Sequence, residues 1–335
     1  MTVETMRALF GGLGPDGEAR ETAVPGPGPG QIRVRVHAAG LNRADLFMLD
    51  GSYNPNTKTS NVYPAGFEFA GVVDALGDGV TGLAVGQRVM GVGLGAFADY
   101  AAVDARHVIP VPEHLSWTDA AALPIGLATE YDALVQTEFT PEMRVLVIGA
   151  TSSVGLAGVQ VAKAVGASQV IATTTSAAKA NTLLAYGADV VVDTSVEKLA
   201  EAVNAATGNA GVDVVLDHVG GALFAEALAA TAIGGTVVSI GRLAGTESAI
   251  DLNLLAFRRL RLLGTTFSIR TPDELADVCT IVTEAVVPLV ADGRVRAVVD
   301  RVFGFDDAHA AAEYMRSNQA VGKIVLDLGG TEDAS

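Results

Sequence analysis

The sequence predicts an α/β protein of two domains, in which the first is rich in β-strands and the second is a doubly wound parallel sheet. Its 335 residues exceed what one small domain usually holds. Short apolar stretches broken by Gly and Pro fill residues 31–110 and indicate a β-barrel or a strongly bent sheet. After Pro124, apolar strands alternate with Ala-rich helical stretches, which is typical of a parallel sheet covered by helices on both faces.

The first domain is expected over residues 1–123. Ile32, Val34 and Val36 alternate with Arg33 and Arg35, so one face of this strand should be buried. Two late strands, around residues 298–303 and 322–328, resemble the start of the chain more than its middle. We therefore expect residues 294–335 to complete the first domain.

The second domain is expected over residues 124–293. Its strands are predicted at 144–149, 169–175, 188–193, 212–219, 235–241 and 260–267, and its helices at 155–166, 177–187, 197–208 and 221–232. A last helix should run from Pro272 to about Gly293. Right-handed crossovers between the parallel strands then give the doubly wound arrangement.

Composition excludes several classes of protein. Half of the residues are apolar and 18% are charged, so the chain can bury a large core. The net charge of −16 repels phosphate backbones, which argues against a nucleic-acid partner. Residues 145–162 carry no charge, but their Gly, Ser, Thr and Gln content argues against a membrane span. The single cysteine, Cys279, excludes a disulfide framework, indicates the cytoplasm, and is expected to be buried.

A strand, a tight turn and a helix follow one another between Arg144 and Ala167. The layout is that of a dinucleotide-binding loop, although Ala and Ser replace the first two glycines of the usual G-x-G-x-x-G pattern. Small residues let the backbone approach a pyrophosphate, which the amides at the helix start then bind. The alternative is a βα turn with only a structural role. The predicted cofactor-binding residues of this loop are Ala150, Thr151, Ser152, Ser153, Val154 and Gly155.

The end of the next strand indicates which nicotinamide cofactor is bound. An Asp or Glu at this position would hold the ribose 2′-hydroxyl of NAD, but the sequence has only hydroxyl groups and a lysine. These groups suit the 2′-phosphate of NADPH, because an anion needs cationic partners. The alternative is an ordinary polar strand end with a solvated lysine. The residues concerned are Thr174, Thr175, Ser176 and Lys179.

With these motifs in place, the chain resembles the medium-chain dehydrogenase/reductase superfamily, specifically its zinc-free quinone oxidoreductase branch. Besides the nucleotide loop, the resemblance rests on Ala38–Tyr53, Pro64–Gly91, Gly95–Pro124 and Gly322–Leu328. It implies a GroES-like catalytic domain, a Rossmann domain, NADPH as the cofactor and a homodimer.

The chain departs from the zinc-dependent relatives at each ligand position. Asn42–Asp45 contains no thiol, and Phe67 stands before Glu68 where those relatives have a metal-binding His. Tetrahedral zinc needs three or four converging ligands, so no metal is expected. The histidines are scattered at His37, His107, His114, His218 and His309.

Without a Lewis acid, the substrate should be one that accepts hydride by conjugation, either a quinone or an α,β-unsaturated carbonyl compound. Charge then develops on an oxygen that hydrogen-bond donors can stabilise. The resemblance places Asn42 beside the nicotinamide and Tyr53 at the substrate, with Asp45 one helical turn away to orient Asn42. Asn42 could instead be a turn residue, and Tyr53 a packed aromatic residue.

Family position adds further cofactor-binding residues, most of them after the strands of the second domain, where ligands of parallel sheets gather. Some family members carry a cation about where Phe267 stands, so the role of this position in substrate polarity is open. These residues are Thr129, His218, Val219, Gly241, Arg242, Phe267, Ser268 and Asn318.

The sequence thus predicts an NADPH-dependent quinone or enone reductase with a small-molecule substrate. A cofactor-binding structural or regulatory protein of the same fold remains the alternative, and a zinc alcohol dehydrogenase is disfavoured. Quinones, enones and enoyl thioesters stay open as substrates, because loops such as Asn54 to Asn61 should shape the substrate site.

Overall fold

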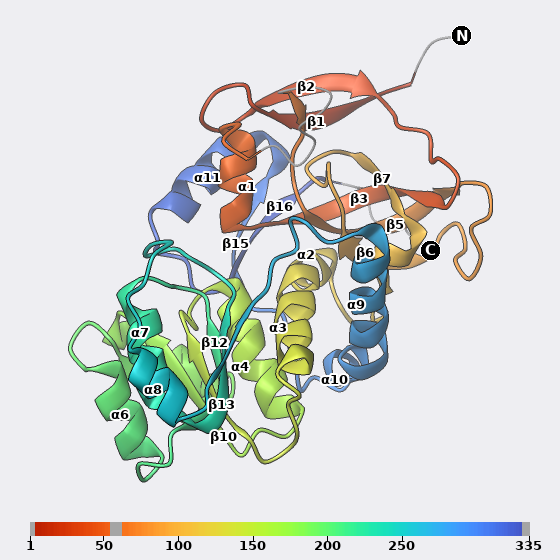
Figure 1. The fold of residues 1–335 in the computed structure, drawn as a ribbon. Coiled ribbons are helices and arrows are strands. Elements are labelled where there is room, and N and C mark those ends of the chain that lie inside the picture. Colours follow the sequence, from red (N-terminus) through yellow and green to blue (C-terminus); the bar gives the residue numbers. More distant parts are fainter. Residues whose placement is uncertain (1–3, 54–61, 330–335) are drawn as a thin grey trace. The chain divides into compact units, whose positions relative to one another are not determined.

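The computed structural model describes residues 4–53 and 62–329, and the predicted substrate loop Asn54 to Asn61 lies outside this part. The chain forms two compact units (Figure 1). The first unit holds the described residues up to Ile125, Thr271–Val287 and those from Ala297 onward; the second holds Gly126–Arg270 and Pro288–Arg296. The predicted α/β fold class, with a β-rich first part and a doubly wound second part, is confirmed.

The first unit is built on two sheets. The smaller has the order β2-β1-β4, and the larger the order β15-β16-β3-β5-β6-β8 with β7 paired to β3. Thus the last strand of the chain, β16, pairs antiparallel with β3. The strands are β1 (Thr5–Gly11), β2 (Glu18–Ala23), β3 (Gln31–Leu41), β4 (Tyr63–Pro64), β5 (Glu68–Leu76), β6 (Arg88–Val92), β7 (Tyr100–Asp104), β8 (Val108–Pro110), β15 (Val299–Gly304) and β16 (Lys323–Asp327).

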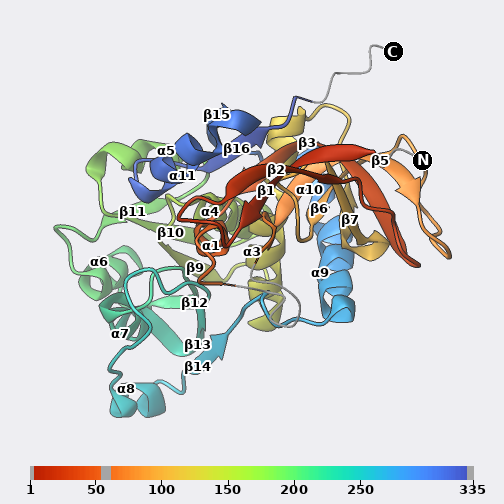
Figure 2. The ribbon, with the colours of Figure 1, turned by 90° about the horizontal axis from the view of Figure 1, so that it is seen from above.

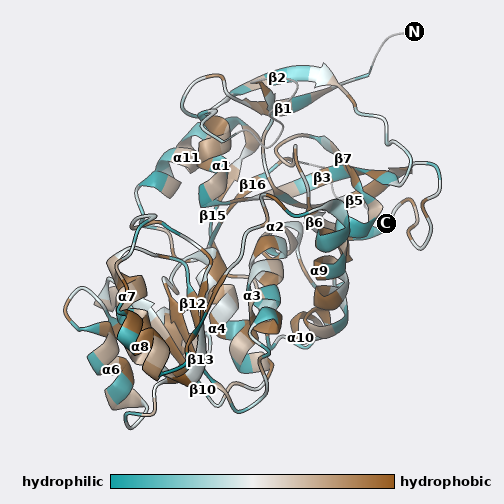
Figure 3. Cartoon of the chain, viewed as in Figure 1, coloured by the Kyte–Doolittle hydropathy of each residue, from teal (hydrophilic) through white to brown (hydrophobic). Residues whose placement is uncertain are grey.

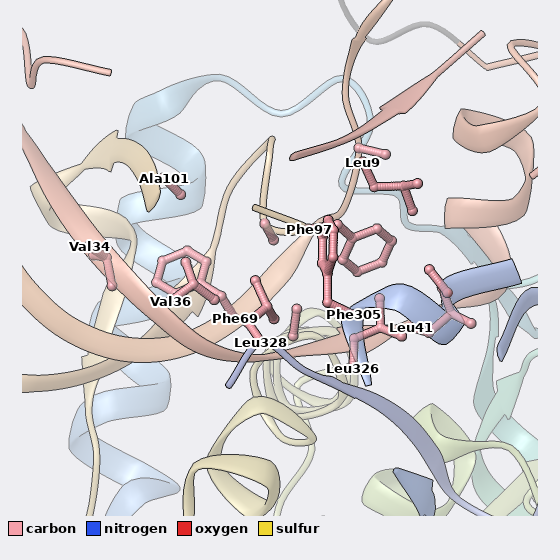
Figure 4. Packing of buried hydrophobic residues seen from close by; sticks show 14 of the residues in the cluster. Leu9, Val34, Val36, Leu41, Phe69, Phe97, Ala101, Phe305, Leu326 and Leu328 are labelled. Carbon is pink, nitrogen blue, oxygen red and sulfur yellow. The ribbon is translucent and has the colours of Figure 1, made fainter. Parts of the chain in front are cut away.

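The alternation along β3 produces the core of this unit. Ile32, Val34 and Val36 are buried, while Arg33 on the other face pairs with Asp74. Figure 4 shows the core that these valines join. Its labelled members come from segments far apart in the chain, including Leu9, Phe69, Phe97, Phe305 and Leu326.

Helix α9 (Pro272–Ala285) belongs to the first unit, whereas the sequence predicted it in the second domain. It contacts β8 and the short helix η1 (Ala105–His107), and His107 Nε2 lies 2.9 Å from the Pro272 carbonyl oxygen. The predicted helix 272–293 is also two helices, since α10 (Val287–Ala291) starts anew and, from Pro288 on, belongs to the second unit. The other helices of this unit are α1 (Arg43–Leu49), α2 (Trp117–Ala121) and α11 (Ala308–Arg316).

The second unit is a six-stranded sheet of order β11-β10-β9-β12-β13-β14, in which every pair is parallel. Helices cover both faces, with α4 and α5 on one and α6 and α7 on the other (Figure 2). The strands are β9 (Arg144–Ile148), β10 (Gln169–Thr174), β11 (Val190–Asp193), β12 (Val212–Asp217), β13 (Thr231–Ser239) and β14 (Arg261–Gly264). The helices are α3 (Pro124–Gln136), α4 (Ser153–Ala164), α5 (Ala180–Ala185), α6 (Leu199–Ala206), α7 (Ala222–Ala230) and α8 (Leu252–Phe257).

Burial on both faces explains why the central strands β9, β10 and β12 are largely apolar, and β12 is brown in the hydropathy colouring of Figure 3. Cys279 on α9 is buried as predicted. Among the described residues, no helix combines the length and apolar character that crossing a membrane would require.

Candidate functional site

The parallel sheet brings most of the predicted cofactor-binding residues of the second unit to one edge. Ile148, Asp217, Ser239 and Gly264 stand in register at the ends of neighbouring strands. The segments that follow them therefore begin at the same carboxyl edge, where ligands of parallel sheets bind. The predicted residues on these segments are Ala150–Gly155, His218, Val219, Gly241, Arg242, Phe267 and Ser268.

The turn after β9 has the geometry of an anion-binding loop. Ser152 is the N-cap of α4, and its Oγ accepts the Gly155 N–H at 3.0 Å. A Cβ on Gly155 would lie 2.6 Å from the Gly149 carbonyl oxygen and 2.7 Å from Ala150 Cα. Only glycine therefore fits at this position, and it lets the turn close tightly against the helix start.

The loop residues differ in what they present to a ligand. Thr151, Ser152, Ser153 and Val154 are partly exposed, whereas Ala150 is fully buried and packs beneath the turn. The exposed stretch coincides with the positive end of the α4 dipole. The residues present thus fit a pyrophosphate at this turn.

At the end of β10, one of the predicted hydroxyl groups already forms a hydrogen bond within the following turn. Thr174 is buried, and its hydroxyl accepts the Ser176 N–H at 3.1 Å, so Thr175, which is exposed, offers the more accessible hydroxyl. Lys179 follows in the short helix η2 (Ala177–Lys179). The carboxylate of Asp193 also lies here, since the Ala177 backbone donates to it. Hydrogen bonds from Ser195, and after them the one from Ala177, lower the pKa of this carboxylate.

Thr129 and Phe267 are two further predicted residues of the second unit. Thr129 lies on α3 and is buried. Phe267 carries the Arg270 guanidinium over its ring at 4.7 Å, and Arg270 also pairs with the buried Asp132. A cation therefore stands beside Phe267, although the residue itself is apolar.

In the first unit, Asn42 belongs to a buried polar cluster. Its Nδ2 donates to Glu68 Oε1 at 2.8 Å, and its Oδ1 accepts from Lys323 Nζ at 2.8 Å. Lys323 also forms an ion pair with Glu68, and both side chains are at most 1% exposed. The second carboxylate oxygen of Glu68 accepts the Ile125 N–H at 2.8 Å. We call Asn42, Glu68 and Lys323 the Asn42 cluster.

Asp45 fixes the backbone beneath this cluster. Its Oδ2 accepts the Asn42 N–H at 2.6 Å at the start of α1, so the residue acts on the backbone of Asn42. The pKa of Asp45 is raised to about 8: complete burial raises it most and the nearby Glu68 carboxylate also raises it, while the hydrogen bonds from Asn42 and the charge of Lys323 oppose the shift.

The structure places Tyr53 and Asn318 around α1. The Tyr53 ring packs against the ring of Phe67, with centroids 6.0 Å apart. Phe67 directly precedes Glu68 of the Asn42 cluster. Asn318 has a left-handed backbone with φ of 56° and accepts a hydrogen bond from Arg43 at 2.5 Å. Arg43 directly follows Asn42, so Asn318 is brought to the start of the same helix.

Sequence reasoning assigned no role to Glu68, Lys323 or Glu130. Each is a charged residue within an apolar stretch, and each is at most 1% exposed. Charged groups are almost never fully buried without a partner, so the charges of Glu68 and Lys323 within apolar strands were the available signal, whereas Glu130 lay in no predicted element.

No group of three or more His, Cys, Asp or Glu side chains that could hold a metal ion occurs within residues 4–53 and 62–329. At the position where zinc-dependent relatives have a His–Glu pair, the Glu68 carboxylate is bound by Lys323, Asn42 and the Ile125 backbone.

Comparisons with known proteins agree with this architecture. Residues 28–113 match the family "Alcohol dehydrogenase GroES-like domain", and residues 153–283 match the family "Zinc-binding dehydrogenase". Quinone oxidoreductase-like protein 2 of Bos taurus is 31% identical over 89% of this chain and 85% of its own length.

Two solved structures are similar over nearly the whole chain. A quinone oxidoreductase of Pseudomonas syringae pv. Tomato DC3000 has a TM-score of 0.84 and 27% identity, and the match covers 96% of this chain and 99% of that one. A mycobacterial protein solved in complex with NADPH has a TM-score of 0.83 and 27% identity, with the same coverage of 96% and 99%. With its fold, its dinucleotide-type turn and these relatives, the chain belongs to the medium-chain dehydrogenase/reductase superfamily, in its quinone oxidoreductase branch.

Proposed function

We propose that this protein is an NADPH-dependent reductase of quinones or α,β-unsaturated carbonyl compounds that works without zinc. The observation that carries the proposal is the Ser152-capped turn at the carboxyl edge of a doubly wound sheet, which fits a dinucleotide pyrophosphate. The NADPH complex of a mycobacterial relative and the quinone oxidoreductases among the similar proteins support it.

Bound NADPH supplies the hydride, and the chain's own residues hold and polarise the reactants. The amide nitrogen of Asn42 carries two N–H groups, and Glu68 accepts only one of them. The second can donate to an oxygen on which charge develops. Glu68 and Lys323 fix the orientation of the amide, because they bind its nitrogen and its oxygen respectively.

Zinc independence rests on the ligand set of the chain. The Glu68 carboxylate, which stands in the family's His–Glu position, is neutralised by Lys323 and has a hydrophobic neighbour, Phe67, in place of the histidine. A conjugated substrate needs no Lewis acid, since one or two donors can stabilise the enolate or hydroquinone anion and water can protonate it.

Steady-state oxidation of NADPH by the purified, metal-analysed protein tests the proposal. A simple quinone, an enone and an enoyl thioester are supplied in parallel, with and without EDTA. We expect turnover with the quinone or the enone at a rate that EDTA leaves unchanged. Dinucleotide binding without turnover on any acceptor would support a structural or regulatory role instead, and a rate that follows zinc content would support an alcohol dehydrogenase.

Replacing Lys179 with alanine is expected to raise the Michaelis constant for NADPH by roughly ten-fold or more, while that for NADH changes little. The ammonium group is proposed to bind the 2′-phosphate, and one charge-assisted contact contributes about 1.5–3 kcal/mol. Lys198→Ala is the matched control, because Lys198 is an exposed lysine of the same unit paired with Glu201. Equal losses with both cofactors would contradict the assignment.

The protein is expected to be a homodimer. Strand β14 forms one edge of the six-stranded sheet, and unpaired edge amides tend to recruit another strand. Phe257 and Ile269, which flank this strand in sequence, are more than four-fifths exposed. Light scattering at micromolar concentration should give twice the 34.2 kDa mass of the chain, and a monomer would contradict the prediction.

We also propose that the protein is cytoplasmic, because its sequence has a single cysteine and therefore no pair for an intrachain disulfide bond. Burial raises the pKa of Cys279 to about 12, so the thiol stays neutral and unreactive at neutral pH. A protein adapted to an oxidising compartment would be expected to carry paired cysteines instead.

A further inference from the structure

Glu130 is a buried carboxylate that the proposed chemistry does not use. It lies on α3 with no exposed surface, and neither carboxylate oxygen has a hydrogen-bond partner among the described residues. Gly158 on α4 makes room for it, because a Cβ at that position would clash with Glu130 Oε2. An isolated buried carboxylate is costly unless a counter-ion compensates for its desolvation.

The group that faces this carboxylate is His218, which directly follows β12. Its Nε2 lies 3.3 Å from Glu130 Oε1, and its side chain is 7% exposed. The Asp217 carboxylate, which accepts the backbone N–H groups of Val219 and Gly220, adds a second negative charge nearby. Arg242, on the loop that follows β13, is a further charged residue of this region. Its Cα would lie 3.3 Å from a Cβ placed on Gly220.

These charges shift the pKa of His218. Burial lowers its pKa, but the Glu130 carboxylate, and after it Asp217, raise the pKa by more, so that the net shift is upward from 6.5. A protonated His218 would place its positive charge 3.3 Å from the buried Glu130 carboxylate and compensate for its burial.

His218 also lies beside the proposed dinucleotide turn. Its backbone N–H donates to the Ile148 carbonyl oxygen at 3.2 Å, and its Cβ would lie 3.4 Å from a Cβ on Gly149. Strands β9 and β12 are neighbours at the point where the strand order reverses, which is where dinucleotides bind in such sheets. A positive charge here favours an anionic ligand.

We propose that Glu130 is a positioning residue that keeps His218 protonated, and that the His218 imidazolium strengthens dinucleotide binding, which therefore weakens as the pH rises. The proposal rests on the proposed function, since it concerns the same dinucleotide turn. It adds a buried acid and a pH dependence to that function.

The sign of the effect follows from linkage. A ligand that favours the protonated form of His218 binds most tightly below the pKa of this residue and loses affinity as the pH rises through it. Removing the carboxylate should lower the pKa of His218, because the Glu130 charge that raises it is gone. The loss of affinity then begins at a correspondingly lower pH.

Two measurements test the pair. The first is an NMR titration of the histidine side chains without cofactor, which is practical because the chain has five histidines; His218→Gln identifies the His218 signal. We expect a His218 pKa above 6.5 in the wild type and a lower value in Glu130→Gln. A pKa at or below 6.5 in the wild type, or one that Glu130→Gln leaves in place, would overturn the proposal.

The second measurement is the dissociation constant of NADPH and of NADH between pH 5.5 and about 9, by fluorescence titration. NADH is included because the 2′-phosphate of NADPH itself titrates near pH 6. If the affinities of NADPH and NADH fall with the same midpoint pH, the titrating group belongs to the protein. Glu130→Gln should move this midpoint to lower pH, and His218→Gln should remove it with roughly a three- to ten-fold loss of affinity at low pH.

His309→Gln is the matched control, because His309 is an exposed histidine of the first unit, and this change should leave the midpoint unaltered. Binding that is tight but independent of pH would overturn the role of His218 and leave the proposed function intact. Failure of both dinucleotides to bind at any pH would overturn both.

Discussion

Replacing Asn42 with alanine is expected to lower turnover by ~10²–10³-fold, the usual effect of losing a donor to a developing oxyanion. The amide is held on both sides by Glu68 and Lys323, so its direction is fixed and it is preorganised for such a role. Steady-state rates with several quinones and electron-poor alkenes measure the effect. Tyr53→Phe should be milder and should act mainly on substrate affinity, since its ring packs on Phe67.

The affinity for NADPH separates a role in turnover from damage to the fold. The proposed dinucleotide turn lies in the second unit, so the dissociation constant of NADPH should be unchanged in Asn42→Ala. Asn253→Ala on α8 is the control for an asparagine-to-alanine change away from the cluster. A loss of only about ten-fold would indicate positioning alone, and full activity on all substrates would refute the assignment of Asn42.

Replacing Lys323 with methionine is expected to destabilise the first unit by about 3–5 kcal/mol, because the change leaves the buried Glu68 charge without its partner. The single tryptophan reports on this unit directly. Trp117 lies on α2, stacked on His37 with ring centroids 4.5 Å apart, so its fluorescence in a urea titration follows the unfolding of the first unit and not of the second.

Two companion variants show whether the cause is the unpaired charge. Glu68→Gln together with Lys323→Met should recover most of the lost stability, since no buried charge remains. Arg20→Met removes an exposed ion pair with Glu18 in the same unit and should cost less than about 1 kcal/mol. A Lys323→Met protein within 1 kcal/mol of the wild type would show that the ion pair contributes little.

The sequence predicted the dinucleotide turn because its determinants are local. The turn needs a strand, small residues at fixed spacing and the start of a helix, and all three fall within Arg144–Ala167. Neighbouring residues are therefore enough to determine its backbone geometry. The predicted parallel sheet followed for a similar reason, since strands buried on both faces are apolar throughout.

The Asn42 cluster could not be predicted in the same way. Lys323 and Glu68 are 255 residues apart in the chain, and nothing near either of them indicates the other. The pair forms because β16 and β5 both lie next to β3, which is a property of the folded sheet. Glu130 and His218 likewise meet only through the packing of α3 on the second unit.

Helix α9 shows the limit of reading domains from an alternating pattern. Its sequence follows β14 as another helix of the second domain would, and its capping box at Thr271 and Glu274 predicts a helix wherever it packs. Its buried side chains, among them Val278 and Val282, do not specify which core they join. Contacts with η1 and β8 place it in the first unit.

The most direct test of the proposed function is to measure deuterium transfer to the product from NADPH that carries deuterium at position 4 of the nicotinamide. The two faces of the ring are labelled in separate samples, an enone is the acceptor, and EDTA is present throughout. The proposed function predicts deuterium on the β-carbon of the reduced enone from one of the two samples, with the second hydrogen coming from water. Reduced enone without deuterium from either sample, or no reduction until zinc is restored, would contradict it.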